Sequence, residues 1–294
     1  MNVLDNTSNF LGISEIQLFG YEHSKCVIQQ LPYEYTSSYH KGSDRGPGAI
    51  LDASHFVEFY DPELRAEAYK NCGIAALEPL DFGNKVDEDA MNLIYERTKM
   101  HLDNDKFVVS LGAEHTVSYG IFKAFQEKHP DIGILQLDAH SDLRSSYEGN
   151  KWSHASVMAR INELKAPIYQ VGIRAQCKEE ADLIDQSSNI NTWFAHEINQ
   201  NEEWIDEVIR KLPEKLYITV DTDGFDPSIC PSVGTAEPGG LMWYPTLRLL
   251  KRVFETCDVK GFDIVELNPK SEEDLTAYTM AQLCYKLIGY KFAL

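Results

Sequence analysis

The chain has 294 residues, of which 43% are hydrophobic and 25% charged, and its formal net charge is −19. This length and composition indicate a globular protein with one large domain or two ordinary ones and ample apolar residues for a core. The strong negative charge argues against nucleic acid or an anionic membrane as a partner and mildly favours cationic small molecules.

Short apolar, β-branched segments alternate with longer amphipathic ones along the chain. The predicted strands are 25–30, 72–78, 106–112, 132–138, 167–173, 190–195, 215–221 and 259–267. The predicted helices are 87–102, 116–129, 154–165, 202–212, 245–256 and 272–292. Acidic residues open the helix at 87, and Pro245 suits the first position of its helix. Several strands are apolar on both faces, which is typical of parallel strands covered by helices.

This alternation of strands and helices predicts an α/β fold. No linker, repeat or change in composition divides the chain, so we expect a single domain over residues 1–294. Periodicity leaves an open sheet and a barrel as alternatives. In both architectures, function resides at the carboxyl ends of the strands.

Cysteine spacing and the N-terminus both bear on the cellular compartment. The six cysteines are widely spaced and form no CxxC motif, which argues against a disulfide framework or a structural zinc site. The N-terminus lacks the basic start and apolar stretch of a targeting peptide, and no apolar run approaches the ~20 residues of a membrane span. We therefore expect a cytoplasmic protein.

Polar side chains follow four of the predicted strands at the point where each strand ends. They are His115 after the strand at 106, Asp138, His140 and Asp142 after that at 132, Asp221 and Asp223 after that at 215, and Glu266 after that at 259. In an extended chain, alternate residues point to the same side. The Asp-x-His-x-Asp and Asp-x-Asp motifs can therefore each converge on one point.

Four converging carboxylates repel one another unless cations lie between them. Two divalent cations would balance their charge, with the two histidines as neutral nitrogen ligands. A site that mixes carboxylate and imidazole suits Mn²⁺, and Ni²⁺, Fe²⁺, Co²⁺ and Zn²⁺ are alternatives. A single histidine or Asp-x-Asp at a strand end is usually structural. The presence of all these motifs in one α/β chain favours the metal site.

The same segments resemble the signatures of the ureohydrolase (arginase/agmatinase) family, and most closely those of agmatinases. The matching motifs are GAEHT (112–116), LDAHSDLR (137–144), VDTDGFDPSICPS (220–232), EPGG (237–240) and DIVELNP (263–269), with a similar opening segment at 31–54. Ala113 and Ala236 replace residues common in the family, and no ligand is lost. The resemblance implies a three-layer αβα sandwich with a mainly parallel eight-stranded sheet.

The resemblance also implies a centre of two Mn²⁺ ions and a role for each polar residue. One ion would be held by His115, Asp138, Asp142 and Asp221, and the other by Asp138, His140, Asp221 and Asp223. Asp138 and Asp221 would bridge the two ions. His154 would be the acid or proton shuttle, Glu266 would bind the guanidinium, and Asp142 would also hold the attacking hydroxide.

The substrate is less sharply indicated than the reaction. Arg144 stands where arginases commonly have an asparagine that grips the amino-acid end of the substrate. We therefore predict an agmatinase, which converts agmatine and water into putrescine and urea. Arginine, guanidinobutyrate, other guanidino acids and free guanidine remain alternatives, as do an inactive family subunit and a single-zinc deacetylase on a related fold. By resemblance, the chain would form homo-trimers or homo-hexamers.

Overall fold

The computed structural model describes residues 2–198, 200–201, 203–271 and 274–294. Eight strands form one sheet, in the spatial order β2-β1-β3-β8-β7-β4-β5-β6. The strands are β1 (Cys26–Leu31), β2 (Ile74–Ala76), β3 (Phe107–Gly112), β4 (Gly133–Leu137), β5 (Ile168–Ile173), β6 (Ile190–Phe194), β7 (Lys215–Asp221) and β8 (Asp258–Val265). Every neighbouring pair is parallel. All the predicted strands are confirmed, and the open sheet replaces the barrel alternative.

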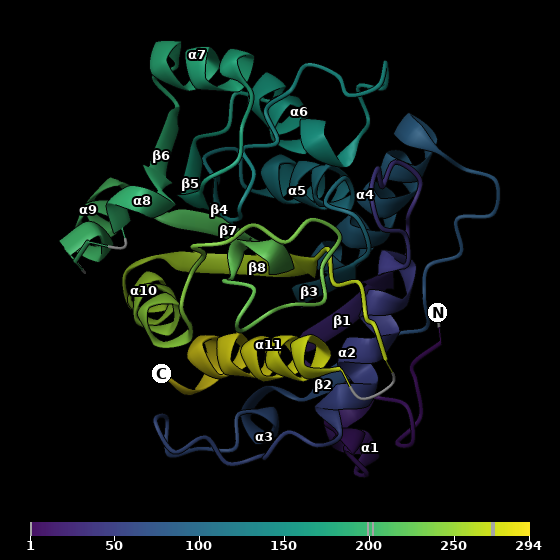
Figure 1. Ribbon diagram of the computed structural model, residues 1–294. Coiled ribbons are helices and arrows are strands. Elements are labelled where there is room, and N and C mark those ends of the chain that lie inside the picture. The colour runs from purple at the N-terminus through teal and green to yellow at the C-terminus, as the bar shows by residue number, and fades with distance from the viewer. Residues whose placement is uncertain (1, 199, 202, 272–273) are drawn as a thin grey trace.

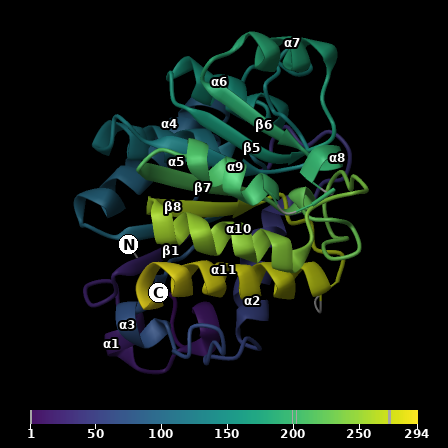
Figure 2. The same ribbon diagram turned by 90° about the vertical axis from the view of Figure 1, so that its left-hand side faces the viewer.

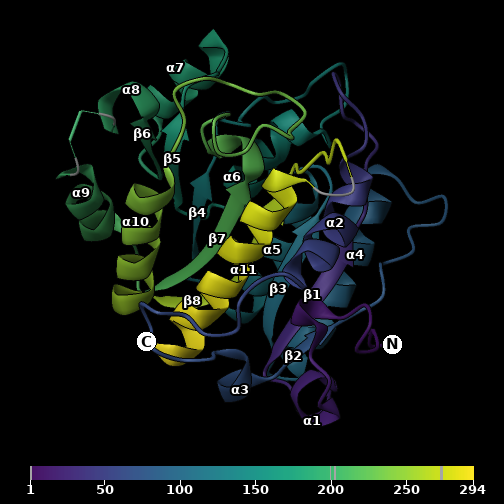
Figure 3. The same cartoon turned by 60° about the horizontal axis from the view of Figure 1, so that its bottom comes forward.

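Helices cover both faces of the sheet, which gives the predicted αβα sandwich (Figures 1 and 2). One face carries α4 (Asp87–Asp103), α5 (Val117–Lys128) and α6 (Val157–Glu163), which pack in that order. The other carries α2 (Gly46–Ser54), α11 (Leu275–Ala293), α10 (Trp243–Thr256) and α9 (Glu203–Lys211), as Figure 3 also shows. The remaining helices are α1 (Ile16–Phe19), α3 (Tyr69–Cys72), α7 (Lys178–Gln186) and α8 (Ala195–Ile198).

The helices agree with the sequence in position and differ in some of their bounds. The predicted helix 154–165 is divided into a 3₁₀ turn at His154–Ser156 followed by α6. Helix α10 begins at Trp243, so the expectation that Pro245 opens it was wrong. Proline is tolerated at the third position because the first N–H groups of a helix have no partner within it. Residues 202 and 272–273, with which two predicted helices begin, lie outside the described residues.

The order of the strands brings distant parts of the chain together. Strand β4 follows β3 in sequence, yet β8 and β7 lie between them in the sheet. Ligands of open α/β sheets bind beyond the carboxyl ends of the strands, where the strand order reverses. The four central strands β3, β8, β7 and β4 are those whose carboxyl ends carry the predicted site residues. In the parts of the chain described, no helix has both the length and the apolarity needed to cross a bilayer.

Candidate metal centre

The predicted site residues come together at the carboxyl ends of the four central strands. His115 follows β3, Glu266 follows β8, Asp221 ends β7, and Asp138 follows β4. His140, Asp142 and Asp223 complete the group from the same loops. The four aspartates and His115 are at most 6% exposed. Most of these residues line a cavity at the carboxyl ends of the strands. His154, the first residue of the 3₁₀ turn before α6, lines it as well.

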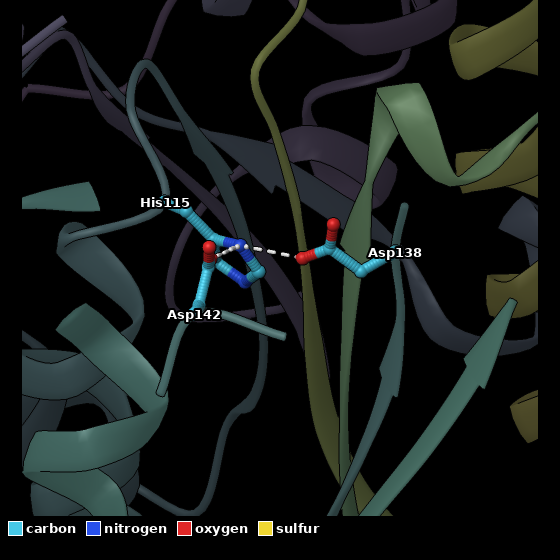
Figure 4. Close-up of side chains that lie close together, drawn as sticks. All are labelled: His115, Asp138 and Asp142. Atoms are coloured by element: carbon cyan, nitrogen blue, oxygen red, sulfur yellow. Dashed lines mark ion pairs between the residues drawn. The ribbon is translucent and has the colours of Figure 1, made fainter. Parts of the chain in front are cut away.

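His115 lies at the centre of three carboxylates. Its Nδ1 atom is 3.0 Å from Oδ2 of Asp142, 3.1 Å from Oδ2 of Asp138 and 3.3 Å from Oδ2 of Asp221. Figure 4 shows the histidine between Asp138 and Asp142, with both carboxylates directed at the same ring nitrogen. His115, Asp138 and Asp142 have ligand atoms within 4.8 Å of one another, which suits one metal ion.

A second group shares Asp138 with the first. Nδ1 of His140 lies 3.1 Å from Oδ2 of Asp223 and 3.7 Å from Oδ1 of Asp138. Asp138, His140 and Asp223 again offer ligand atoms within 4.8 Å of one another. Asp138 therefore presents one oxygen to each group, which is the arrangement of a bridging ligand. Asp221 contacts the first group through His115.

The pKa values of these carboxyls reflect burial and crowding. Burial raises the pKa of Asp138 and, with the charge of Asp138, raises that of Asp142 to about 7. Burial and the charge of Asp223 raise the pKa of Asp221 well above its usual range. Burial lowers the pKa of His140, but the charges of Asp223, Asp138 and Asp142 together outweigh it and raise this pKa to about 11. The cluster thus requires positive charge, from protons or from cations.

The hydrogen bonds around His115 fit a metal ion at its Nδ1 atom. Thr219 donates to Oδ1 of Asp263 at 2.6 Å, so Nε2 of His115 donates to the Thr219 hydroxyl at 2.9 Å. In the neutral imidazole, Nδ1 then carries the lone pair. It has no hydrogen-bond partner among the described residues, and three carboxylate oxygens surround it. A cation between these groups satisfies all of them, and the mixed oxygen and nitrogen donors suit Mn²⁺ and similar ions.

Two of the acidic residues have left-handed backbones, which is uncommon for residues other than glycine. Asp142 has φ 54° and Glu266 has φ 63°. The carbonyl of Asp142 accepts the N–H groups of Met158 and Ala159 at the start of α6, at 2.9 and 3.2 Å. Glu266 donates its N–H to the carbonyl of Ala113 at 2.7 Å, and its Oε1 accepts the N–H of His115 at 2.7 Å. Such strain is typical of functional sites.

Thr36 fixes the tautomer of His154. Oε2 of Glu114 accepts the N–H groups of Tyr35 and Thr36 at 3.2 and 2.8 Å, so it acts as the acceptor for the Thr36 hydroxyl at 3.1 Å. The Thr36 oxygen then accepts the backbone N–H of His154 at 3.1 Å and Nδ1–H of its ring at 3.2 Å. Nε2 is left as the ring's free acceptor. Burial and the nearby histidines lower the pKa of His154 to about 4.

Arg144 lies at the same cavity, which has a volume of about 450 Å³. Its Nε atom is 3.9 Å from Oε2 of the buried Glu180, and its guanidinium lies over the ring of Tyr147 at 5.4 Å. Glu180 also accepts the N–H groups of Leu143 and Cys177, at 2.9 and 2.7 Å. Arg144 is therefore paired with a carboxylate.

Sequence reasoning missed the residues that hold these side chains in place. They include Thr36, Glu114, Gln136, Thr219 and Asp263. A signal existed for three of them, because Gln136, Thr219 and Asp263 interrupt otherwise apolar strands. Thr36 gave no such signal, since its contact with His154 spans 118 positions of the chain.

Most of the chain is similar to known proteins. The profile of the arginase family matches residues 24–289. The chain is 40% identical over 276 residues to N(1)-aminopropylagmatine ureohydrolase of Synechocystis sp., covering 92% of this chain and 90% of the relative. It is 36% identical to agmatinase of Bacillus cereus, covering 85% of each. The crystal structure of agmatine ureohydrolase of Thermoplasma volcanium superposes with a TM-score of 0.83 at 31% identity, covering 92% and 91%.

Proposed function

The chain belongs to the arginase family, and from its paired metal-ligand groups we propose that it hydrolyses the guanidinium group of agmatine. Guanidinium and water would give the free amine and urea, which for agmatine are putrescine and urea. The observation that carries this proposal is Asp138, which offers one oxygen to each of two ligand groups. We further propose that the resident ions are two Mn²⁺ per chain.

The side chains have distinct parts in the proposed reaction. When bound, two divalent ions supply a nucleophile at neutral pH and take up developing negative charge. One ion would be held by His115, Asp138, Asp142 and Asp221. The other would be held by Asp138, His140, Asp221 and Asp223. Glu266 would bind the cationic guanidinium by charge-assisted hydrogen bonds. His154, neutral near pH 7 and with Nε2 free to accept, would take up a proton and pass it to the leaving amine.

The cavity favours an amine substrate over arginine. Arg144 is already paired with Glu180 and covers Tyr147, so it is not placed as a free anchor for an α-carboxylate. A second candidate is N(1)-aminopropylagmatine, which the 40% identical relative is named for. The exposed ring of Tyr39 beside His40 at the cavity would suit its longer cationic chain. The cytoplasmic location and the trimeric or hexameric assembly remain predictions.

The test is urea release from a panel of guanidino compounds, with Mn²⁺ or Ni²⁺ added to metal-free protein. The panel contains agmatine, N(1)-aminopropylagmatine, arginine, guanidinobutyrate and free guanidine. We expect the highest kcat/KM with one of the two amines and two ions bound per chain. A preference for arginine would contradict the proposed substrate.

The same experiment separates the other hypotheses. Urea release from none of the compounds, with two ions bound, would indicate an inactive family subunit. One zinc ion per chain in the protein as purified, before metal is removed, would indicate the deacetylase alternative. Asp138→Asn should abolish urea release and weaken metal binding, because it removes the charge shared by both groups; full activity in this variant would refute the proposed centre.

A further inference from the structure

A row of polar side chains crosses the interior of the sheet at a single register. Each member is the direct partner of the next on the neighbouring strand. In spatial order they are Gln29, Ser110, Asp263, Thr219, Gln136, Gln170 and Thr192. Polar groups buried in a sheet are costly unless they are hydrogen-bonded. Some members of this row contact the metal-ligand residues, as Gln136 does, and others, such as Gln29, do not.

Gln136 is the member that contacts a proposed bridging ligand. Its Nε2 atom donates to Oδ2 of Asp138 at 2.7 Å and to the carbonyl of His140 at 3.2 Å. Its Oε1 accepts Nε2 of Gln170 at 2.6 Å, and Gln170 also donates to the carbonyl of Ser141 at 2.8 Å. The hydroxyl of the half-buried Thr192 donates to Oε1 of Gln170 at 2.9 Å. Both glutamines are fully buried.

The orientation of both amides is dictated by their surroundings. Main-chain carbonyls can only accept, so the carbonyls of His140 and Ser141 each require the NH₂ end of a glutamine. The oxygen of Gln136 must then face Gln170, and that of Gln170 must face Thr192. Reversing either amide would place oxygen against oxygen at two contacts. Asp138 therefore always receives an N–H donor from Gln136.

This donor leaves Asp138 in a defined orientation. Its Oδ2 accepts Gln136, and its Oδ1 accepts the N–H of His140 at 2.6 Å. Each oxygen keeps a lone pair, one facing His115 and the other facing His140. The two glutamines also bind the main chain between Asp138 and Asp142. They thus hold both the rotation of the carboxylate and the path of the loop that carries three ligands.

We propose that Gln136, supported by Gln170 and Thr192, is the positioning element that sets Asp138 as the bridge between two metal ions. The inference rests on the proposed two-metal function and adds to it the residues that fix the geometry. Gln29 provides a matched control. It lies in the same row, is 1% exposed, and donates to Thr98 and Ser110, both at 2.9 Å, away from the metal ligands.

The test measures Mn²⁺ binding to metal-free full-length protein by titration calorimetry, together with its thermal midpoint. We expect Gln136→Met to weaken binding by about 10- to 100-fold, the usual cost of losing a group that orients a ligand. Gln136→Glu keeps the size of the side chain, removes the donor, and should weaken binding at least as much. Gln170→Met, which leaves Gln136 in place, should have a smaller effect in the same direction. Gln29→Met should lower the thermal midpoint and leave the affinity unchanged.

The outcomes separate this inference from the proposed function. If wild-type protein fails to bind two Mn²⁺ ions, the proposed metal centre fails. If wild type binds two ions and Gln136→Met binds them as tightly as Gln29→Met does, only the positioning role is overturned. A reduced affinity in Gln170→Met supports the role even where Gln136→Met does not fold, and an unchanged affinity in Gln170→Met argues against the relay.

Discussion

Glu266 combines a left-handed backbone with a half-buried carboxyl at the cavity of the metal-ligand residues. Burial raises the pKa of Glu266 well above its usual range, and nearby Glu114 adds to the effect of burial. A cationic guanidinium would favour the ionised form. Glu266→Gln keeps an acceptor for the N–H of His115 and removes the charge. Because hydrogen bonds to charged groups contribute about 1.5–3 kcal/mol, we expect kcat/KM for agmatine to fall about 10- to 100-fold.

The control for this prediction is a measurement of the metal bound by the Glu266→Gln variant. Glu266 belongs to neither ligand group. The variant should therefore still bind two ions per chain, as measured by elemental analysis. Loss of metal with the loss of activity would show that Glu266 acts on the centre rather than on the guanidinium.

The hydroxyl of Thr36 holds the ring of His154, and comparing valine with serine at this position tests that role. Thr36→Val cannot accept Nδ1–H of His154, so the ring loses the bond that leaves Nε2 as its free acceptor. We expect kcat to fall about tenfold or more, with the ~10²–10⁴-fold contribution of a general acid–base group as the upper bound, and little change in KM. Thr36→Ser retains the hydroxyl and should restore kcat. Equal activity of the valine and serine variants would contradict this role.

At the scale of elements, the strands were predictable because most of them are largely apolar segments buried on both faces. Helices α2 and α7 were missed for physical reasons. Gly46, Pro47 and Gly48 give α2 little intrinsic helix propensity, and its packing against α11 compensates. Helix α7 is mostly polar, and its buried residue is Glu180, which the capping box uses. Tertiary contacts, rather than the local sequence pattern, thus determine that these two segments are helical.

The metal-ligand candidates were predictable because they follow apolar strand segments at short spacing. They do not all lie on an extended strand as expected, because β4 ends one residue before Asp138, Asp142 has a left-handed backbone and Asp223 lies in a 3₁₀ turn. The sequence did not show which of these residues would lie next to one another in space. Four strand ends meet because β8 and β7 insert between β3 and β4, an order that no local signal encodes. Gln136 stood two residues before Asp138 in the sequence, but its partner Gln170 belongs to another strand. The supporting contacts could be recognised only after the strand order was known.

The turn at 222–224 approaches the end of β4 so closely that only glycine fits at one position. A Cβ atom on Gly224 would lie 2.8 Å from the backbone N of Asp138 and 2.9 Å from the carbonyl carbon of Leu137. Gly224→Ala must therefore separate the turn that follows Asp221 and contains Asp223 from Asp138. We expect a loss of about 1–3 kcal/mol in the free energy of unfolding and weaker Mn²⁺ binding.

Gly48 gives the matched control for this substitution. It lies in α2, and a Cβ atom added there meets no atom within 4 Å. Gly48→Ala should stabilise the protein by about 0.5–1 kcal/mol through helix propensity and leave Mn²⁺ binding unchanged. Denaturation and metal titration of both variants check the prediction. Wild-type metal affinity in Gly224→Ala would show that the close approach does not position the ligands.

Helix α4 contains a buried histidine that should make stability depend on pH. Burial lowers the pKa of His101 to about 3, with nearby Arg97 adding to the effect. The unfolded chain binds this proton near pH 6.5, so the contribution of His101 is present above that pH and is lost as pH falls. From pH 7 to 5, the loss approaches about 2 kcal/mol. His101→Gln should show a smaller loss over the same interval in denaturant unfolding. Parallel curves for both proteins would contradict this assignment.

At the scale of the whole molecule, the net charge of −19 should act on the rate of substrate capture. Agmatine carries two positive charges near pH 7, and an acidic surface attracts it at low ionic strength. Salt screens this attraction, with a Debye length of about 10 Å at 0.1 M. Raising NaCl should therefore lower kcat/KM for agmatine several-fold while kcat stays constant, because the bound substrate is shielded from bulk ions. The guanidinium ion carries one charge, so its inhibition constant should depend less steeply on salt. Equal dependence for both ions would show that long-range charge does not steer the substrate.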